Sequence, residues 1–379
     1  EGLLIVSTKG KKVVIAMSGG VDSSVAAAML VEQGYEVVGM MLRLWSDPGS
    51  EVYNRCCTPA SMSMARRIAA QLEIPFYAVD AKNVFKDQVV DYFIEGYSQG
   101  VTPNPCLMCN RHIRWEFLLN KALSLDAEYM ATGHYARVIH EEGQPVQLLK
   151  GIDESKDQSY VLSVLNQSQL SRALFPLGEF TKTEIREMAE SYKLPVAKTK
   201  DSQDLCFLGG SNYASFLEKY APNTSTPGQI IQKDGNQLGE HNGLAFYTIG
   251  QRKGLGLSSP VPLYVIEKDI QNNQIIVGPM EELGRSELSA GAVNWVTGDV
   301  PDSPFAGEIK IRYQASNSTG VVTPIDSDKF NIAFDQPLRD ITPGQAAVVY
   351  QGEEVIANGI IEGENELARD IIPVELVSK

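Results

Sequence analysis

Over residues 12–197, short apolar runs alternate with longer amphipathic or alanine-rich segments. The apolar runs predict strands over residues 12–17, 35–44, 75–79 and 128–132, and the longer segments predict helices over 21–33, 60–72, 114–123 and 183–192. Alternating strands and helices build βαβ units on a parallel sheet, which binds ligands at the carboxyl ends of its strands. We therefore expect an α/β fold with a parallel-sheet domain over residues 10–209.

The pattern changes near residue 210, where turn signals such as Thr226-Pro227-Gly228 and Asn242-Gly243 become dense. Farther on, short alternating runs predict strands over residues 308–313, 320–324, 329–334, 346–350 and 354–361. This spacing is typical of a β-barrel or a β-sandwich. We expect a small central domain over residues 210–288 and a C-terminal β domain over 289–379.

Composition narrows the class of protein. Of the 379 residues 43% are hydrophobic and 21% are charged, which suits a folded globular protein. No window approaches the roughly 18 apolar residues of a membrane span, and residues 3–6 are too short an apolar run for a secretion signal, so we expect a cytoplasmic protein without a membrane partner. The net charge of −14 argues against a general polyanion binder, although basic pairs such as Arg66-Arg67 and Arg252-Lys253 can still form a local basic face.

The sharpest motif is Ser18-Gly19-Gly20-Val21-Asp22-Ser23-Ser24, which follows a predicted strand and opens a predicted helix. Glycines let the backbone approach a ligand closely, and the first N–H groups of a helix attract anions. No Lys-Ser or Lys-Thr pair follows the glycines, so this is not a Walker loop. Asp22 would repel a phosphate unless a cation lay between them, which suggests Mg²⁺. The alternative is an ordinary turn in which Ser and Asp cap the helix.

Five cysteines, an odd number in a long chain, do not fit a disulfide scaffold. Cys109 follows a proline-rich loop and lies near the start of a helix with several cations, a setting that favours the thiolate. Cys206 lies in a polar stretch. Cys106, Cys109 and Cys206, with His112, could hold zinc or an iron–sulfur cluster, or be buried inert thiols, but a single Cys-x-x-Cys favours thiol exchange chemistry. We assign no role to Cys56-Cys57.

Several motifs in order carry a resemblance to a known family. They are Ser18–Ser24, residues 102–110, Ala131-Thr132-Gly133-His134-Tyr135, Lys156-Asp157-Gln158-Ser159-Tyr160, residues 200–207, residues 248–256, Ile311-Arg312-Tyr313 and Thr342-Pro343-Gly344-Gln345. The first resembles the pyrophosphate loop (PP-loop) of the ATP pyrophosphatase superfamily, whose members split ATP between the α and β phosphates. Together they resemble the tRNA-specific 2-thiouridylase family over about residues 12–362.

The resemblance implies a PP-loop α/β domain, a small central domain and a C-terminal β-barrel. It also implies 2-thiolation of the wobble uridine of tRNA: ATP adenylates O2 of the uracil, and a persulfide then delivers sulfur to the activated carbon. Cys109 stands at the position of the catalytic nucleophile and Cys206 at that of the persulfide carrier. The ATP-binding positions are Ala16, Met17, Ser18, Gly19, Gly20, Val21, Asp22, Ser23, Leu42 and Gly133.

The positions that the resemblance implies for tRNA contacts are Asn104, Pro105, Cys106, Lys156, Asp157, Gln158, Arg312 and Tyr313, with His134 and Gln345 in tRNA discrimination. It also implies ATP and a protein that supplies persulfide sulfur, while Mg²⁺ follows from the argument on Asp22. We expect a monomer, because tRNA binders of this size are often monomeric. We assign no metal ligand.

Many family members carry Asp where this chain has Cys106. A third thiol favours either a resolving role or an iron–sulfur cluster through Cys106, Cys109 and Cys206. The alternative functions are another PP-loop adenylating enzyme, such as an amidotransferase or ligase, and a non-catalytic tRNA adaptor that binds adenine nucleotide or an iron–sulfur cluster.

Overall fold

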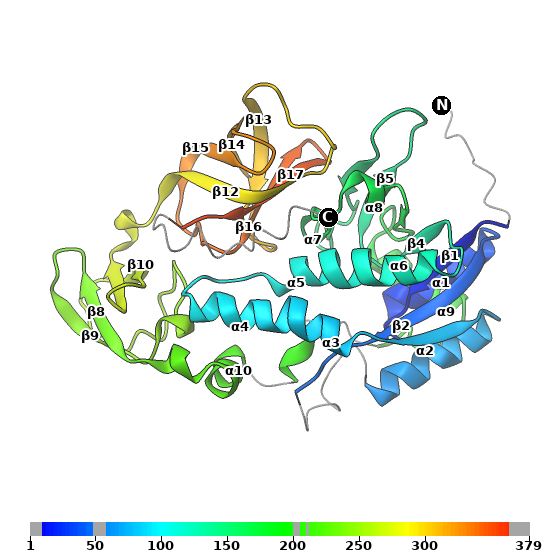
Figure 1. Cartoon of the computed structure of the whole chain (residues 1–379), viewed down its shortest axis with the longest axis horizontal. Helices are drawn as coiled ribbons and strands as arrows, with labels where there is room; N and C mark the ends of the chain where they lie inside the picture. The colour runs from blue at the N-terminus through cyan, green and yellow to red at the C-terminus, as the bar shows by residue number, and fades with distance from the viewer. Residues whose placement is uncertain (1–9, 48–57, 200–204, 210–211, 364–379) are drawn as a thin grey trace.

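A computed structural model describes residues 10–47, 58–199, 205–209 and 212–363. These residues form three sheets: a parallel sheet, a small central sheet and a barrel (Figure 1). No described helix is both long enough and apolar enough to cross a membrane. The division at residues 209/210 and 288/289 stays a prediction.

The parallel sheet has the order β3-β2-β1-β4-β7, with every pairing parallel. Its strands are β1 (Lys12–Ala16), β2 (Glu36–Arg43), β3 (Phe76–Asp80), β4 (Tyr129–Ala131) and β7 (Ala173–Leu174). The first four were predicted within two residues at each end, while the two-residue β7 was missed. The strand order reverses direction between β1 and β4, so the carboxyl ends of these two strands flank the natural ligand position of such a sheet.

Helices cover both faces of this sheet, because the side chains of each strand alternate between two hydrophobic clusters. Val13 and Ile15 of β1 pack with α1 (Val21–Glu32), α2 (Pro59–Gln71) and α9 (Lys182–Ser191). Val14 faces the opposite cluster, built on α3 (Lys82–Phe85), η1 (Lys86–Val90), α4 (Asp91–Ser98) and the helix over residues 105–123. The segment 82–98 was not predicted as a helix.

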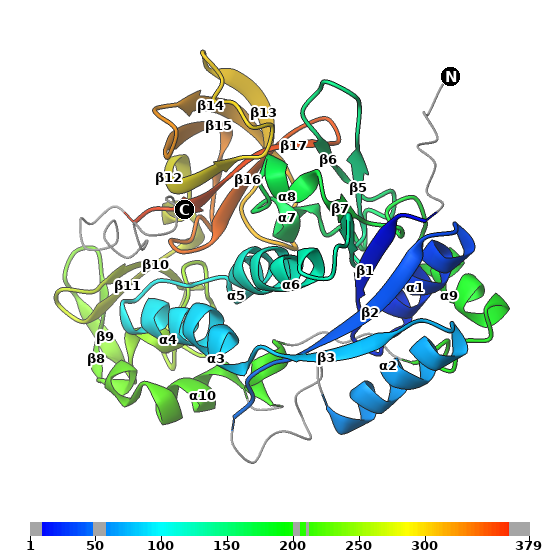
Figure 2. The same ribbon diagram turned by 45° about the vertical axis from the view of Figure 1, so that its right-hand side comes forward.

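The helix over residues 105–123 begins nine residues before the predicted start at residue 114. It runs through α5 (Pro105–Met108), the π-helical segment η2 (Cys109–Leu118) and α6 (Leu119–Leu123). Pro105 takes the first helical position, where its missing N–H costs nothing, and the Asn104 side chain caps the helix. This helix and α4 run side by side between the parallel sheet and the other two sheets (Figure 2).

The central sheet has the order β10-β11-β8-β9 and a small core of its own. Its strands are β8 (Gly228–Gln232), β9 (Gln237–His241), β10 (Tyr264–Asp269) and β11 (Gln274–Gly278), and α10 (Tyr213–Tyr220) precedes them.

Six C-terminal strands form a closed barrel rather than a sandwich, since β12 pairs with both β15 and β17. They are β12 (Arg285–Trp295), β13 (Phe305–Lys310), β14 (Ser318–Pro324), β15 (Phe330–Leu338), β16 (Ala346–Gln351) and β17 (Glu354–Ile361). β12 starts before the predicted boundary at residues 288/289. A hairpin from the N-terminal half, β5 (Ala136–Ile139) with β6 (Gln147–Lys150), joins β17, and α7 (Ser159–Leu162) and α8 (Gln167–Leu170) follow it.

Candidate active site

The loop between β1 and α1 is closely packed and leads into a helix start without a side-chain cap. Gly19 has a φ of +76°, and a Cβ there would lie 2.4 Å from the Ser61 carbonyl oxygen, so only glycine fits. Gly20 is the N-cap of α1 and receives no side-chain cap, which contradicts the interpretation of this motif as a capped turn. The Ser23 hydroxyl accepts a hydrogen bond from the Ser18 N–H at 3.1 Å and thereby shapes the loop.

The segment that follows β4 packs directly against this loop. A Cβ on Gly133 would lie 2.7 Å from the backbone nitrogen of Ser23 and 2.9 Å from the carbonyl carbon of Asp22. Leu42, also predicted to bind ATP, lies partly buried near the carboxyl end of β2. The predicted nucleotide residues therefore gather at the carboxyl edge of the sheet, around the point where the strand order reverses.

Asp22 has two partners that the sequence did not reveal. The Lys182 ammonium donates to both of its carboxylate oxygens at 2.7 and 2.9 Å, and the Tyr135 hydroxyl donates at 2.8 Å. The Lys182 side chain is only 12% exposed, and its ammonium lies 5.7 Å from the centre of the Tyr135 ring. One sequence signal was available: a lysine in the first turn of a helix opposes the helix dipole, so such a lysine suggests another role.

These contacts remove the reason for placing Mg²⁺ beside Asp22. We expected a metal because an unpaired carboxylate would repel phosphate, but the cation beside Asp22 is the Lys182 ammonium. Within the described part of the chain, no group of three or more His, Cys, Asp or Glu side chains could hold a metal ion. Mg²⁺ and an iron–sulfur cluster therefore stay predictions.

The two cysteines of the helix over residues 105–123 differ in environment. Asn104 accepts hydrogen bonds from the Cys106 and Leu107 N–H groups at 3.2 and 3.4 Å, so the exposed Cys106 occupies the first turn. Cys109 lies one turn farther on and is 7% exposed, within the hydrophobic cluster. Cys109 is the fifth residue of the helix, near its start as expected, and Cys106 lies closer still to the N-terminus.

Cys206 opens the short helix η3 (Cys206–Leu208) and is partly buried. Its neighbour Phe207 is fully buried and packs edge-on against Phe85 and Phe93, with ring centroids 6.2 and 5.2 Å apart. This anchors Cys206 against the same hydrophobic cluster that contains Cys109. Cys56 and Cys57 lie outside the described residues.

Three segments that were predicted to contact tRNA meet around Cys106. Burial raises the pKa of the Tyr160 hydroxyl, which the Asn104 side chain contacts, and Cys106 is close enough to raise it further. Burial likewise raises the pKa of Tyr313, with further increases from Asp157 and Cys106. Tyr313 is 37% exposed and its ring lies 6.1 Å from that of Tyr160, so an aromatic surface borders the exposed thiol.

Two predicted tRNA residues are buried instead of facing solvent. The His134 ring nitrogen lies 2.7 Å from the Thr132 hydroxyl, and burial, with a smaller effect of Arg114, lowers the pKa of His134 to about 3. The Asp157 carboxylate accepts hydrogen bonds from the Gly151 N–H and from the backbone and hydroxyl of Ser159. Both side chains are therefore largely buried, and their contacts with tRNA stay predictions.

Other predicted tRNA residues bind the protein itself. The Gln158 side chain accepts a hydrogen bond from the Tyr135 N–H at 3.0 Å. It thereby connects residues 156–158 to Tyr135, whose hydroxyl donates to Asp22. Arg312 and Gln345 contact the barrel and the loop before Cys106, respectively. Pro105 is buried in the first helical turn, and Lys156 is partly exposed.

Three family models match consecutive parts of the chain. They describe a tRNA methyl transferase HUP domain over residues 11–210, a tRNA methyl transferase PRC-barrel domain over 214–279 and an aminomethyltransferase beta-barrel domain over 285–361. The first alone spans more than half of the chain.

Relatives match nearly the whole chain. The tRNA-specific 2-thiouridylase MnmA of Natranaerobius thermophilus is 46% identical and covers 92% of this chain and 97% of its own length. That of Carboxydothermus hydrogenoformans is 45% identical, with coverage of 93% and 98%. Among solved structures, the U34-tRNA thiolase NcsA from Methanococcus maripaludis, with its [4Fe-4S] cluster, is 19% identical over 57% of this chain and 68% of its own, with a TM-score of 0.33. A superposition this weak supports no functional argument.

Proposed function

This chain belongs to the tRNA-specific 2-thiouridylase family, and we propose that it thiolates the wobble uridine of tRNA through Cys109 and Cys206. The observation that carries the proposal is the pairing of two features. A glycine loop built for phosphate lies at the carboxyl edge of the sheet, and two cysteines border one hydrophobic cluster on the face of that sheet covered by the thiol helix, residues 105–123.

The first step is activation of the base. O2 of uracil attacks the α-phosphate of ATP, an O–P bond forms, and pyrophosphate leaves. The N–H groups at the start of α1 bind the phosphates. Gly133 has no Cβ, so the backbone of the loop at Asp22 and Ser23 can pack against it without a clash. Lys182 supplies a positive charge beside the loop and balances Asp22. Mg²⁺ enters this proposal as the counterion of ATP, bound through the phosphates.

The second step is sulfur transfer. The terminal sulfur of a Cys206 persulfide attacks C2 of the adenylated uracil, a C–S bond forms, and AMP leaves. The Cys109 thiolate then attacks the Cys206 sulfur, and the bond between the two sulfurs of the former persulfide breaks. Thiouridine is released with the electron pair of that bond, and a Cys109–Cys206 disulfide remains. A dithiol reductant restores the two thiols before the next turnover.

The proposal includes partners and setting. The persulfide on Cys206 comes from a sulfur-donor protein, and the enzyme acts in the cytoplasm as a monomer on tRNA. The target base must leave its stack to reach both the nucleotide and the thiols. Cys106 is a third thiol beside this site, and we assign the resolving step to Cys109 because it is the family's nucleophile position.

The test measures pyrophosphate release and modified nucleosides separately. Purified protein is incubated with tRNA, ATP, Mg²⁺ and a persulfide donor, and the tRNA is digested and analysed by mass spectrometry. Cys206→Ser should abolish thiouridine formation while tRNA-dependent pyrophosphate release continues. Normal thiolation by this variant would remove the assignment of Cys206.

The same analysis distinguishes thiolation from methylation, which the descriptions of the matching domain models mention. Sulfur-for-oxygen exchange and methyl transfer give nucleosides of different mass. Methylated uridine without thiouridine would overturn the proposed function as a whole.

A further inference from the structure

The segment that leads into the thiol helix is held by the barrel. Residues 100–104 connect α4 to this helix, and a turn of the barrel over residues 342–345 contacts them from the other side. The Thr102 N–H donates to the Pro343 carbonyl at 3.0 Å, and the Gln345 side chain donates to the Thr102 carbonyl at 2.9 Å. Both backbone groups of Thr102 are therefore bonded to this turn, 243 residues away in sequence.

A second link lies two residues farther along the first segment, at Asn104, and at Ala346, the residue after Gln345. The Tyr160 hydroxyl donates to the Ala346 carbonyl at 3.1 Å, and the Asn104 side chain bonds to Tyr160. Asn104 is the cap of the helix that carries Cys106 and Cys109. The contacts of Thr102 and of Asn104 therefore hold the helix cap at two points. They set the position of the first turn of the helix, which carries Cys106.

The turn itself is built to approach Thr102 closely. Gly344 has a φ of +88°, and a Cβ there would lie 3.0 Å from the Thr102 carbonyl oxygen. Arg312 braces the turn, since its guanidinium donates to the Asp340 carbonyl at 2.9 Å and to the Thr342 hydroxyl at 2.5 Å. The guanidinium also lies 3.4 Å from the Asp340 carboxylate.

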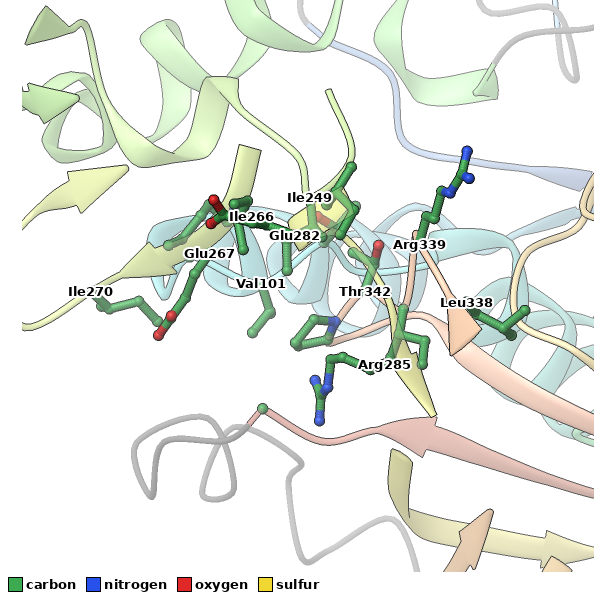
Figure 3. A pocket seen from close by; sticks show the side chains of 18 of the residues that line it. Val101, Ile249, Ile266, Glu267, Ile270, Glu282, Arg285, Leu338, Arg339 and Thr342 are labelled. Carbon is green, nitrogen blue, oxygen red and sulfur yellow. The ribbon is translucent and has the colours of Figure 1, made fainter. Parts of the chain in front are cut away.

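A cavity adjoins this contact, beside the close approach of Gly344 to Thr102. The cavity has a volume of about 260 Å³ and is lined by Val101 and Thr102 on one side and by Thr342 and Pro343 on the other. Figure 3 shows Val101, Ile249, Thr342 and Arg339 around it. A side chain beside empty space makes fewer van der Waals contacts, and its backbone position then depends more on its polar partners.

We propose that the barrel turn over residues 342–345 positions the thiol helix, and that Gln345 contributes to this through its hydrogen bond to Thr102. This inference rests on the proposed function of Cys109 and Cys206. Gln345 is a positioning residue: its amide holds Thr102, Thr102 and Asn104 set the entry of the helix, and the helix sets Cys109. Arg312 acts one step earlier by holding the turn.

The test replaces Gln345 with methionine, which has a similar length but no donor. The matched control is Gln351→Met, because the Gln351 amide also donates to a barrel carbonyl, that of Ala306 at 3.2 Å, far from Thr102 in the fold. We expect Gln345→Met to lower the kcat of thiolation about tenfold, less than the roughly 100-fold that a misplacement of about 1 Å at a reacting group can cost. The dissociation constant for tRNA and the single-turnover rate of tRNA-dependent pyrophosphate release should stay at wild-type values.

A further readout follows the helix itself. Cys106 is exposed in the first turn, so loosening of the cap should raise its rate of alkylation by a maleimide in Gln345→Met and leave it unchanged in Gln351→Met. Gly344→Ala serves as a second variant, since it pushes on Thr102 with Gln345 intact and should give the same separation of kcat from tRNA affinity.

Weaker tRNA binding in Gln345→Met with an unchanged alkylation rate would overturn the inference and assign Gln345 to RNA contact. Wild-type kinetics in both Gln345→Met and Gly344→Ala would overturn it as well. Failure of the proposed function is a different result, because wild-type protein would then form no thiouridine.

Discussion

Gly133 offers the most direct test of the nucleotide site, because its surroundings leave no room for a single added methyl group. The Cβ of Gly133→Ala would lie 2.7 Å from the Ser23 backbone nitrogen, whereas ordinary contact begins at 3.4 Å, so the two segments must separate by 3.4 − 2.7 = 0.7 Å. The neighbouring atoms belong to the backbone of the first turn of α1. No side chain can rotate away, and the phosphate loop must move.

Overpacking of this kind costs about 1–3 kcal/mol of stability. A displacement near 1 Å at a reacting group can cost on the order of 100-fold in rate. We expect Gly133→Ala to lower kcat/KM for ATP about 10- to 100-fold in an assay of tRNA-dependent pyrophosphate release. Its midpoint of thermal unfolding should fall by a few degrees, about the shift that a loss of this size produces in a large domain.

The control places a similar overlap far from the nucleotide. A Cβ on Gly359, in β17 of the barrel, would lie 2.9 Å from the Ala290 Cβ and 3.0 Å from the Phe330 ring. Gly359→Ala should lose comparable stability and keep its kcat/KM for ATP. Equal losses of kcat/KM in both variants, or none in Gly133→Ala, would refute the placement of ATP on this loop.

Three further predictions address charge, pH and the third thiol. Lys182→Met leaves the Asp22 carboxylate without its cation near the phosphates, and it should weaken ATP binding at least tenfold by calorimetry. A double-mutant cycle with Asp22→Asn should give a coupling free energy of about 1–3 kcal/mol for ATP binding. Additive effects of the two substitutions would disprove the cooperation of Lys182 with Asp22. Burial lowers the pKa of His134 from 6.5 to about 3. Below pH 6.5 the unfolded chain therefore binds a proton at this residue and the folded chain does not. The free energy of unfolding then decreases as the pH is lowered, by up to about 1.4 kcal/mol per pH unit. Urea unfolding between pH 6.5 and 5 should show this slope in wild type, and a slope that persists undiminished in His134→Gln would contradict it. Cys106→Ser should still complete one turnover and leave a Cys109–Cys206 disulfide in mass spectra, whereas loss of that first turnover would identify Cys106 as the resolving thiol.

Local pattern was enough to predict much of the fold. The strands β1 to β4 and the helices α1, α2 and α9 were predicted within one or two residues, because the period of apolar residues and the turn residues between segments are properties of neighbouring positions. The glycine loop could be read for the same reason: the strand, the turn and the helix start are consecutive in sequence. The helical segments over residues 82–98 were missed, although Phe85, Val89 and Phe93 recur at helical spacing.

What lies far apart in sequence was decided only by tertiary packing. The contact of Lys182 with Asp22 joins positions 160 residues apart, and that of Gln345 with Thr102 joins positions 243 apart. No periodicity reports such pairs, since each partner has an ordinary local sequence, and the burial of His134 was hidden for the same reason. The sequence therefore determined which elements form and where the phosphate loop lies, whereas only the tertiary structure determined which charge neutralises Asp22 and what holds the thiol helix, because those depend on how distant segments fill space against one another.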